Sequence, residues 1–269
     1  ANHVELALKH DIDILWIGAR STVSPFIVQE IAEALRGTDK PVLIKNPVNP
    51  DLSLWLGAVE RFYSCDIKNL GVIHRGFSTY EKTNYRNNPE WQIAIELQNK
   101  FPDLPLILDP SHIAGRRDII FDLCQTALGL NYDGFMVETH HDPDNAWSDA
   151  AQQVTPSNLK KIIKDLKIRK ITDHADKYKN DLNNLRTKIN LVDNQLLDIL
   201  GKRMNIAEEI GVLKKENNVA VLQSKRWNDI LQKMIADGKK KDLSEQFILR
   251  VFKAIHQESI NHQQSIFKQ

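Results

Sequence analysis

Five apolar runs in the first 140 residues each end on a residue type that binds anions or metal ions. In chain order they lead into Gly18-Ala19-Arg20, Lys45, His74-Arg75, Asp109-Pro110-Ser111-His112 and Glu138. Arginine and lysine bind phosphates and carboxylates through charge-assisted hydrogen bonds, while imidazole and carboxylate groups ligate divalent metal ions. Two arginines, a lysine, two histidines and a carboxylate gathered at one place would suit a phosphorylated, anionic substrate beside a metal ion.

The segments between these runs have the apolar spacing of helices, and several begin with a capping residue before proline or an acid. We expect helices over residues 25–36, 52–63, 89–101, 117–128 and 156–166. This alternation indicates an α/β fold, part of a TIM-type β/α barrel with about five strands, in which groups at the carboxyl ends of the strands converge on one site. A closed barrel has eight strands, so about three units would be missing upstream, and we expect the chain to be truncated at its N-terminus.

The hydrophobic period changes in the second part of the chain. Residues 169–180 are polar and are expected to form a linker between a barrel segment, 1–168, and an all-α domain of three helices, 181–269. Three- and four-residue steps predict one long helix whose apolar seam needs a partner, formed by Leu182, Leu185, Ile189, Val192, Leu196, Ile199, Ile206, Ile210 and Leu213. Two further helices, 225–236 and 243–266, would be separated by a break at Asp237-Gly238.

The overall composition is that of a globular protein, with 42% apolar and 26% charged residues. A net charge of +1 over 269 residues argues against a general nucleic-acid binder. The sequence has no apolar run near the ~20 residues of a membrane span. Cys65 and Cys124 are expected to be buried free thiols in a reducing compartment, which favours a cytoplasmic location.

The first segment resembles the type I 3-deoxy-D-arabino-heptulosonate 7-phosphate (DAHP) synthases. The resemblance rests on the strand-end motifs above and on Val137-Glu138-Thr139-His140 followed by Ala146-Trp147-Ser148-Asp149. It implies that phosphoenolpyruvate condenses with erythrose 4-phosphate, that phosphoenolpyruvate is held by Arg20, Lys45 and Arg75, and that a divalent metal such as Mn²⁺ is ligated by His112, Glu138 and Asp149. Taken singly, Arg20 or Lys45 would equally fit a cation that caps a strand end in solvent; five strands in order favour the site.

The family's fourth metal ligand, a cysteine on the first strand, and its Lys-Pro-Arg-Thr segment are absent from this sequence. Cys65 and Cys124 fall in helix-like stretches and cannot replace that ligand. We therefore expect this chain to bind metal weakly and to catalyse the condensation poorly or not at all.

The second segment resembles the all-helical chorismate mutases. The matching residues run from Leu185-Arg186-Thr187-Lys188-Ile189 through Asp193, Lys202-Arg203 and Gly211-Val212-Leu213-Lys214 to Arg226, Ser259 and Gln263. The resemblance implies a homodimer that rearranges chorismate to prephenate without a cofactor. Arg203, Arg226 and a partner's Arg186 would hold the carboxylates, Lys214 and Gln263 would bond the ether oxygen, and Ser259 would support them.

Helical geometry gives an independent test of this assignment. Arg203 and Lys214 are 11 residues apart, which returns to within about 20° of the same helix face, whereas Arg186 lies 17 residues before Arg203, roughly 25 Å away. Arg186 therefore cannot share the site of its own chain. Two departures put the substrate hydroxyl contact in doubt, because Gln223 and Trp227 stand where the family usually has acids.

Alternative interpretations remain open at this level. The barrel would also suit a related synthase that condenses phosphoenolpyruvate with another sugar, and the helical domain would suit a regulatory module that binds chorismate or prephenate without turnover. Arg203 would also fit a seam residue whose charge reaches solvent. His140 and His141 resemble a metal pair, but adjacent strand residues point to opposite faces. Lys239-Lys240-Lys241 is expected in a solvated loop, and Trp55, Trp91 and Trp147 are expected in the core.

Overall fold

The computed structural model describes residues 2–80, 83–169, 176–222 and 224–268. The chain divides into two compact units, Ala1–Ile171 and Thr172–Gln269, which are described separately below. Among the described residues, no helix is long and apolar enough to cross a membrane.

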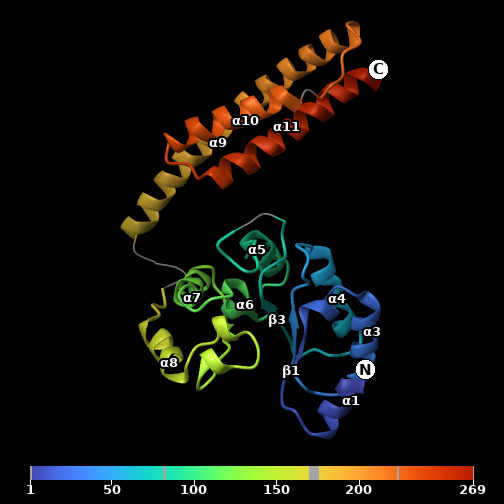
Figure 1. Ribbon diagram of the computed structural model, residues 1–269, viewed down its shortest axis with the longest axis vertical. Coiled ribbons are helices and arrows are strands. Elements are labelled where there is room, and N and C mark those ends of the chain that lie inside the picture. Colours follow the sequence, from blue (N-terminus) through green and yellow to red (C-terminus); the bar gives the residue numbers. More distant parts are fainter. Residues whose placement is uncertain (1, 81–82, 170–175, 223, 269) are drawn as a thin grey trace. The chain divides into compact units, whose positions relative to one another are not determined.

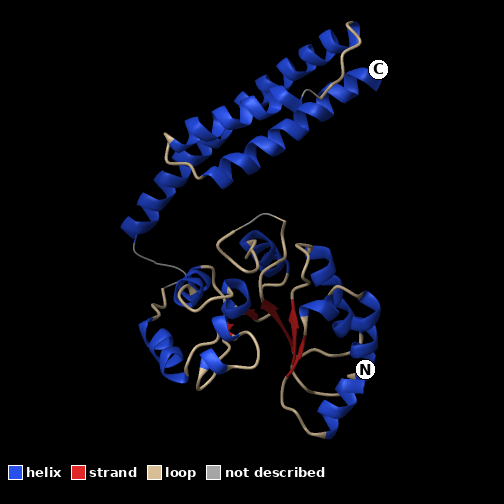
Figure 2. Cartoon of the chain, in the orientation of Figure 1, coloured by secondary structure: helices blue, strands red, loops and turns tan. Residues whose placement is uncertain are grey.

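The first unit is built on a five-stranded parallel sheet (Figure 2). Its strands lie side by side in chain order, as in a β/α barrel, and are β1 (Leu15–Ile17), β2 (Val42–Lys45), β3 (Leu70–His74), β4 (Leu106–Leu108) and β5 (Gly134–Phe135). The register aligns Lys45 with Ile73 and His74 with Leu108. The polar strand ends therefore meet at one edge, which confirms the predicted fold class.

Helices flank these strands (Figures 1 and 2). They are α1 (Asn2–Lys9), α2 (Ala19–Thr22), α3 (Pro25–Ala34), α4 (Leu52–Ser64), α5 (Trp91–Lys100), α6 (Pro110–Ala114), α7 (Ile120–Gly129) and α8 (Pro156–Asp165), with 3-10 turns η1 (Pro143–Asn145) and η2 (Ala150–Gln152). Side-chain caps fix the starts of α3, α4, α6 and α8, where Ser24, Asp51, Asp109 and Thr155 each accept a bond from the backbone N–H group three residues later. Two predicted starts were too early: α5 begins at Trp91 and α7 at Ile120, and neither has a side-chain cap.

The core of the first unit lies on both faces of the sheet, and all five residues of β3 are buried. Trp55 and Phe62 of α4 are fully enclosed, and Cys65 and Cys124 are buried free thiols as predicted, although Cys65 follows α4 instead of lying within it. Trp91 is half-buried against the core. The expectation for Trp147 was wrong: its side chain is fully exposed in the loop after η1.

The second unit consists of three helices, α9 (Asp176–Glu216), α10 (Ser224–Lys239) and α11 (Glu245–Lys268). Helix α9 begins inside the segment predicted as a linker. The predicted break at Asp237-Gly238 is also wrong, because α10 continues to Lys239. Gly238 instead gives room to α11: a Cβ there would lie 2.5 Å from Ile248 Cγ1.

Helix α11 packs along α9, and α10 packs along α11. Met204, Ala207 and Ile248 are buried between them, together with the polar side chains of Ser259 and Gln263. The first half of α9 keeps its apolar seam exposed; the exposed fractions there are Leu185 56%, Ile189 60%, Val192 61%, Leu196 53% and Ile199 61%. Within the described residues, α10 and α11 therefore leave the first half of the predicted seam without a packing partner.

Candidate active sites

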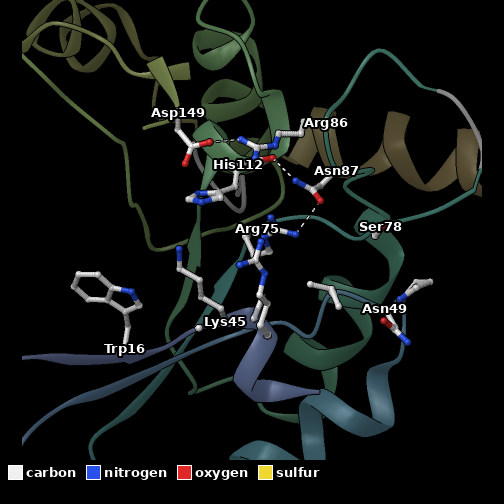
Figure 3. Close-up of a pocket in the computed structure, with 14 residues that line it drawn as sticks. Trp16, Lys45, Asn49, Arg75, Ser78, Arg86, Asn87, His112 and Asp149 are labelled. Atoms are coloured by element: carbon white, nitrogen blue, oxygen red, sulfur yellow. Dashed lines mark hydrogen bonds and ion pairs between the residues drawn. The ribbon is translucent and has the colours of Figure 1, made fainter. Parts of the chain in front are cut away.

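A cavity of about 900 Å³ lies at the carboxyl ends of the strands in the first unit (Figure 3). Arg20 reaches it from α2, Lys45 from the end of β2, Arg75 from the residue after β3 and His112 from α6. Asp149, just before η2, completes the wall beside His112. The structure thus places five of the residues predicted from the sequence around one cavity.

The cations of this cavity are unequally neutralised. Lys45 Nζ lies 2.8 Å from Asp109 Oδ2 in a buried ion pair. Arg75 donates from Nη1 to Asn87 Oδ1 at 2.9 Å. Within the described parts of the chain, neither Arg20 nor Arg75 pairs with a carboxylate. Two guanidinium groups that face one cavity and have no carboxylate partner among the described residues favour an anionic ligand.

Burial lowers the pKa of the Arg75 guanidinium. Asp109 opposes this shift, while the positive charges of Arg86 and Arg20 add to it. The arginines therefore repel one another across the cavity. A bound phosphate or carboxylate would relieve that repulsion.

The three predicted metal ligands lie together, since one ligand atom each of His112, Glu138 and Asp149 falls within 4.8 Å of the others. His112 Nε2 is 3.7 Å from Glu138 Oε1, and His112 Nδ1 is 2.8 Å from Asp109 Oδ2. Burial alone would raise the pKa of Asp109, but the contacts with His112 and Lys45 hold it below its ordinary value. One imidazole with two carboxylates fits a divalent ion such as Mn²⁺, and the buried Asp109 carboxylate lies against Nδ1 of that imidazole.

Two residues that sequence reasoning missed link these candidate ligands. Arg86 Nη1 donates to Asp149 Oδ1 and to Gln152 Oε1, each at 2.6 Å. Gln152 Nε2 in turn donates to Glu138 Oε2 at 2.7 Å, and Gln152 is buried. Arg86 lies in a loop and Gln152 ends the 3-10 turn η2, and neither segment has a periodic apolar pattern. The one local signal is the Asn87-Asn88-Pro89 that follows Arg86, which marks a turn.

His74 does not face the cavity, contrary to the expectation of two histidines at the site. Its ring is fully buried, and Nδ1 lies 2.7 Å from the Tyr132 hydroxyl. The rings of Trp55, Phe77 and Trp91 surround it. Burial lowers the pKa of His74 to about 4, so a neutral imidazole packs the strand end.

The side chains of His140 and His141 do not point to opposite faces, as adjacent residues of a strand would. They lie side by side, with centroids 4.4 Å apart, because the chain here leaves the strand: only an isolated bridge joins Thr139 to Val154. Neither residue belongs to the candidate metal cluster among the described residues.

A second cavity, of about 330 Å³, lies within the helical unit. Arg203 and Lys214 of α9, Arg226 of α10, and Ser259 and Gln263 of α11 line it together. The guanidinium of Arg203 donates to Ser259 Oγ, and Lys214 Nζ donates to Gln263 Oε1 at 3.2 Å. The remaining predicted residue, Arg186, is exposed on α9 and does not line this cavity.

Burial lowers the pKa of both Arg203 and Lys214. The described lining holds three cations and no acid, so the cavity favours an anion. Gln223 lies outside the described residues. Trp227 does line the cavity and stacks on His256, with ring centroids 3.9 Å apart and an interplanar angle of 18°. His256 carried no motif that would have singled it out.

Comparison with known proteins places both units. The profile of the DAHP synthetase I family matches residues 2–173, and that of chorismate mutase type II matches residues 185–264. A phospho-2-dehydro-3-deoxyheptonate aldolase of Thermotoga maritima is 29% identical over 155 residues, which cover 58% of this chain and 44% of that protein. A bifunctional chorismate mutase/prephenate dehydratase of Buchnera aphidicola is 35% identical over 89 residues, covering 33% and 23%.

A solved structure gives the same result for the first unit. A truncated form of 3-deoxy-D-arabino-heptulosonate 7-phosphate synthase from Thermotoga maritima superposes with a TM-score of 0.51 at 28% identity, covering 56% of each chain. The chain spans less than half the length of the aldolase of Thermotoga maritima and of the bifunctional protein of Buchnera aphidicola named above. It belongs to the DAHP synthetase I family and carries a chorismate mutase type II domain after its barrel segment.

Proposed function

We propose that this chain serves aromatic amino-acid biosynthesis through its two units. The helical unit rearranges chorismate to prephenate. The first unit carries groups for the condensation of phosphoenolpyruvate with erythrose 4-phosphate to DAHP, which we expect to be slow in this chain because the family's cysteine ligand and Lys-Pro-Arg-Thr segment are absent from its sequence. The observation that carries the proposal is the convergence of Arg203, Lys214, Arg226, Ser259 and Gln263 from three helices on one cavity. The two buried free thiols support a reducing compartment such as the cytoplasm.

The helical cavity suits the mutase reaction. Chorismate is a dianion, and its pericyclic rearrangement passes through a compact, polarised transition state that an enzyme accelerates by clamping the carboxylates and stabilising charge on the ether oxygen. Arg203 and Arg226 would hold the carboxylates. Ser259 fixes Arg203 by accepting its hydrogen bond. Lys214, held against Val221 O at 2.5 Å and Gln263 Oε1 at 3.2 Å, would point its charge at the ether oxygen.

We further propose that Arg186 completes the site of a second copy of this chain. Its place on α9, roughly 25 Å from Arg203 along the helix, rules out the site of its own chain. The exposed apolar side chains between them supply a surface for a homodimer. In an antiparallel pair of α9 helices, the first turns of one chain lie beside the cavity of the other, and each site borrows one arginine.

In the barrel unit, Arg20, Lys45 and Arg75 would hold the phosphate and carboxylate of phosphoenolpyruvate. Arg20 and Arg75 are free to do so, while Lys45 is already oriented by Asp109. His112, Glu138 and Asp149 would hold the divalent ion, for which their donor set is suited. Such an ion supplies a Lewis acid that polarises the aldehyde of erythrose 4-phosphate.

The mutase assignment is tested by chorismate consumption with the wild-type chain and with Arg203→Ala. We expect turnover by the wild type and a loss of about 100-fold or more in kcat/KM for the variant, because a buried charged contact to the transition state is removed. Saturable binding of chorismate or prephenate without turnover would instead support the regulatory module and contradict the mutase.

The anion site of the barrel is tested by calorimetric titration with phosphoenolpyruvate. Arg75→Ala should weaken binding at least about tenfold, since a charge-assisted bond to the ligand is lost. Arg116→Ala is the matched control, because Arg116 is exposed outside the cavity and pairs with Asp118 at 3.3 Å. Equal affinities of the two variants would contradict this use of the cavity.

A further inference from the structure

The stacked pair of Trp227 and His256 forms one wall of the helical cavity. Trp227 comes from α10 and His256 from α11. The two rings are nearly parallel, with an interplanar angle of 18°. The indole face thus fixes the plane of the imidazole that borders the cavity.

Most polar groups of this wall are already committed to protein partners. Ser259 accepts from Arg203 and donates to Ile255 O at 2.8 Å, and Gln263 Oε1 accepts from Lys214. Within the described residues, neither ring nitrogen of His256 has a hydrogen-bond partner. His256 is therefore a lining side chain with free capacity both to donate and to accept a hydrogen bond.

The surroundings of His256 keep its ring neutral at neutral pH. Burial lowers the pKa of His256, and the charges of Arg203 and Lys214 lower it further. A neutral imidazole has one donor and one acceptor nitrogen. The imidazole of His256 can therefore accept a hydrogen bond from a hydroxyl group, which the three cations around it cannot do.

We propose that His256, held in place by Trp227, recognises the ring hydroxyl of chorismate. The proposal rests on the mutase function proposed above and adds a specificity-determining residue to it. Carboxylates and the ether oxygen are acceptors and suit the cations of the cavity, whereas the hydroxyl is the one substrate group that also needs an acceptor. A site that hydrogen-bonds a substrate hydroxyl discriminates strongly against an analogue that lacks it.

The test compares chorismate with its analogue lacking the ring hydroxyl, using the dimeric wild-type chain and His256→Phe. The phenyl ring keeps the stacking on Trp227 but has no nitrogen. We expect His256→Phe to lower kcat/KM for chorismate about tenfold, chiefly through KM, and to leave the value for the analogue within about twofold. His256→Gln, which retains a donor and an acceptor, should stay within about threefold of the wild type for both compounds.

A loss of the same size for both compounds would show a merely structural role and overturn the proposal, as would unchanged values for chorismate. If the wild-type chain binds chorismate but does not turn it over, the mutase function is wrong. The role of His256 is then decided by the change in dissociation constant that His256→Phe causes for each of the two compounds. Failure of the wild-type chain to bind chorismate would overturn both.

Discussion

Single residues divide the cavity of the first unit into a side with the cations Arg20, Lys45 and Arg75 and a side with the candidate metal ligands. Lys45 and His112 both contact the buried Asp109 carboxylate, at 2.8 Å each. Arg86 donates hydrogen bonds to both Asp149 and Gln152, and Gln152 donates one to Glu138. The ligand types alone do not set the geometry of the cluster, because these neighbouring groups hold the carboxylates in place.

We predict that Gln152→Ala weakens the binding of Mn²⁺ by about tenfold, because outer-shell partners of metal ligands affect affinity on that scale. Gln152 donates to Glu138 Oε2 at 2.7 Å, and its loss frees that carboxylate to rotate. Calorimetric titration with Mn²⁺ measures the effect. Gln92→Ala serves as the control, because Gln92 is exposed on α5 and donates to Glu96 of the same helix. Identical affinities would show that Gln152 does not position Glu138.

At the residue scale, sequence reasoning succeeded where chemistry follows a regular element. Arg20, Lys45 and Arg75 reach the cavity because parallel strands bring their carboxyl ends to one edge. It failed for His74, because alternation places neighbouring residues on opposite faces without saying which faces the cavity. It missed Gln152 and His256 because their positions depend on the path of a loop and on helix packing, which leave no local pattern.

Close approach of α9 and α11 is what brings the two halves of the helical cavity together. Gly211 is the point of contact: a Cβ there would lie 3.2 Å from Gln263 Cα and 3.3 Å from its Cγ. Lys214 and Gln263 bond across the same contact. The geometry of the site is thus tied to a small residue on α9.

Gly211→Val should lower the stability of the helical unit by about 1–3 kcal/mol through overpacking and should reduce mutase activity, because Gln263 must move. Gly201→Val is the matched control, since nothing in the described chain lies within 4 Å of a Cβ at that position; valine there should be neutral or stabilising, as it is a better helix former than glycine. Thermal unfolding followed by circular dichroism compares them. Equal melting temperatures would refute the close contact.

His262 joins α11 to α9 in a pH-dependent way. Its Nδ1 lies 2.7 Å from Glu208 Oε1 of α9, and its Nε2 lies 3.3 Å from Glu258 Oε1. The hydrogen bond with Glu208 raises the pKa of His262. Burial opposes this shift, and the charges of both glutamates add to it, so the pKa stays above its ordinary value. The folded chain therefore binds this proton more tightly than the unfolded chain does.

This stabilisation is complete below the ordinary histidine pKa of about 6.5 and is lost as the pH rises through the raised value. We predict that the melting temperature of the wild type exceeds that of His262→Gln by more at about pH 5.5 than at about pH 8.5. Thermal melts of both chains at the two pH values measure the difference. A difference in melting temperature between the two chains that stays constant or grows with pH would contradict the prediction.

At the scale of the whole molecule, the order of strands and helices was predictable because the period of apolar residues changes from β/α units to a long seam. The seam on α9 was predicted to need a partner, and α10 and α11 leave its first half exposed, as at Ile189 and Leu196. The start of α9 at Asp176 was not predictable, because polar residues support a solvent-exposed helix and a linker equally well.

The proposed homodimer makes each mutase site depend on two chains. Arg203 belongs to the chain that holds the cavity, and Arg186 would come from its partner. In a mixed dimer of Arg186→Ala and Arg203→Ala chains, one site then carries both substitutions and the other carries neither. The two variants must be exchanged by unfolding and refolding together so that mixed dimers form.

Chorismate turnover of this mixture is the most direct test of a mutase built from two chains. Each variant alone should be nearly inactive, while an equimolar refolded mixture should recover about a quarter of wild-type activity, because half of the dimers are mixed and half of their sites are intact. No recovery, with an active wild-type chain and correctly folded dimeric variants, would contradict the shared site. Full activity of Arg186→Ala alone would contradict it as well.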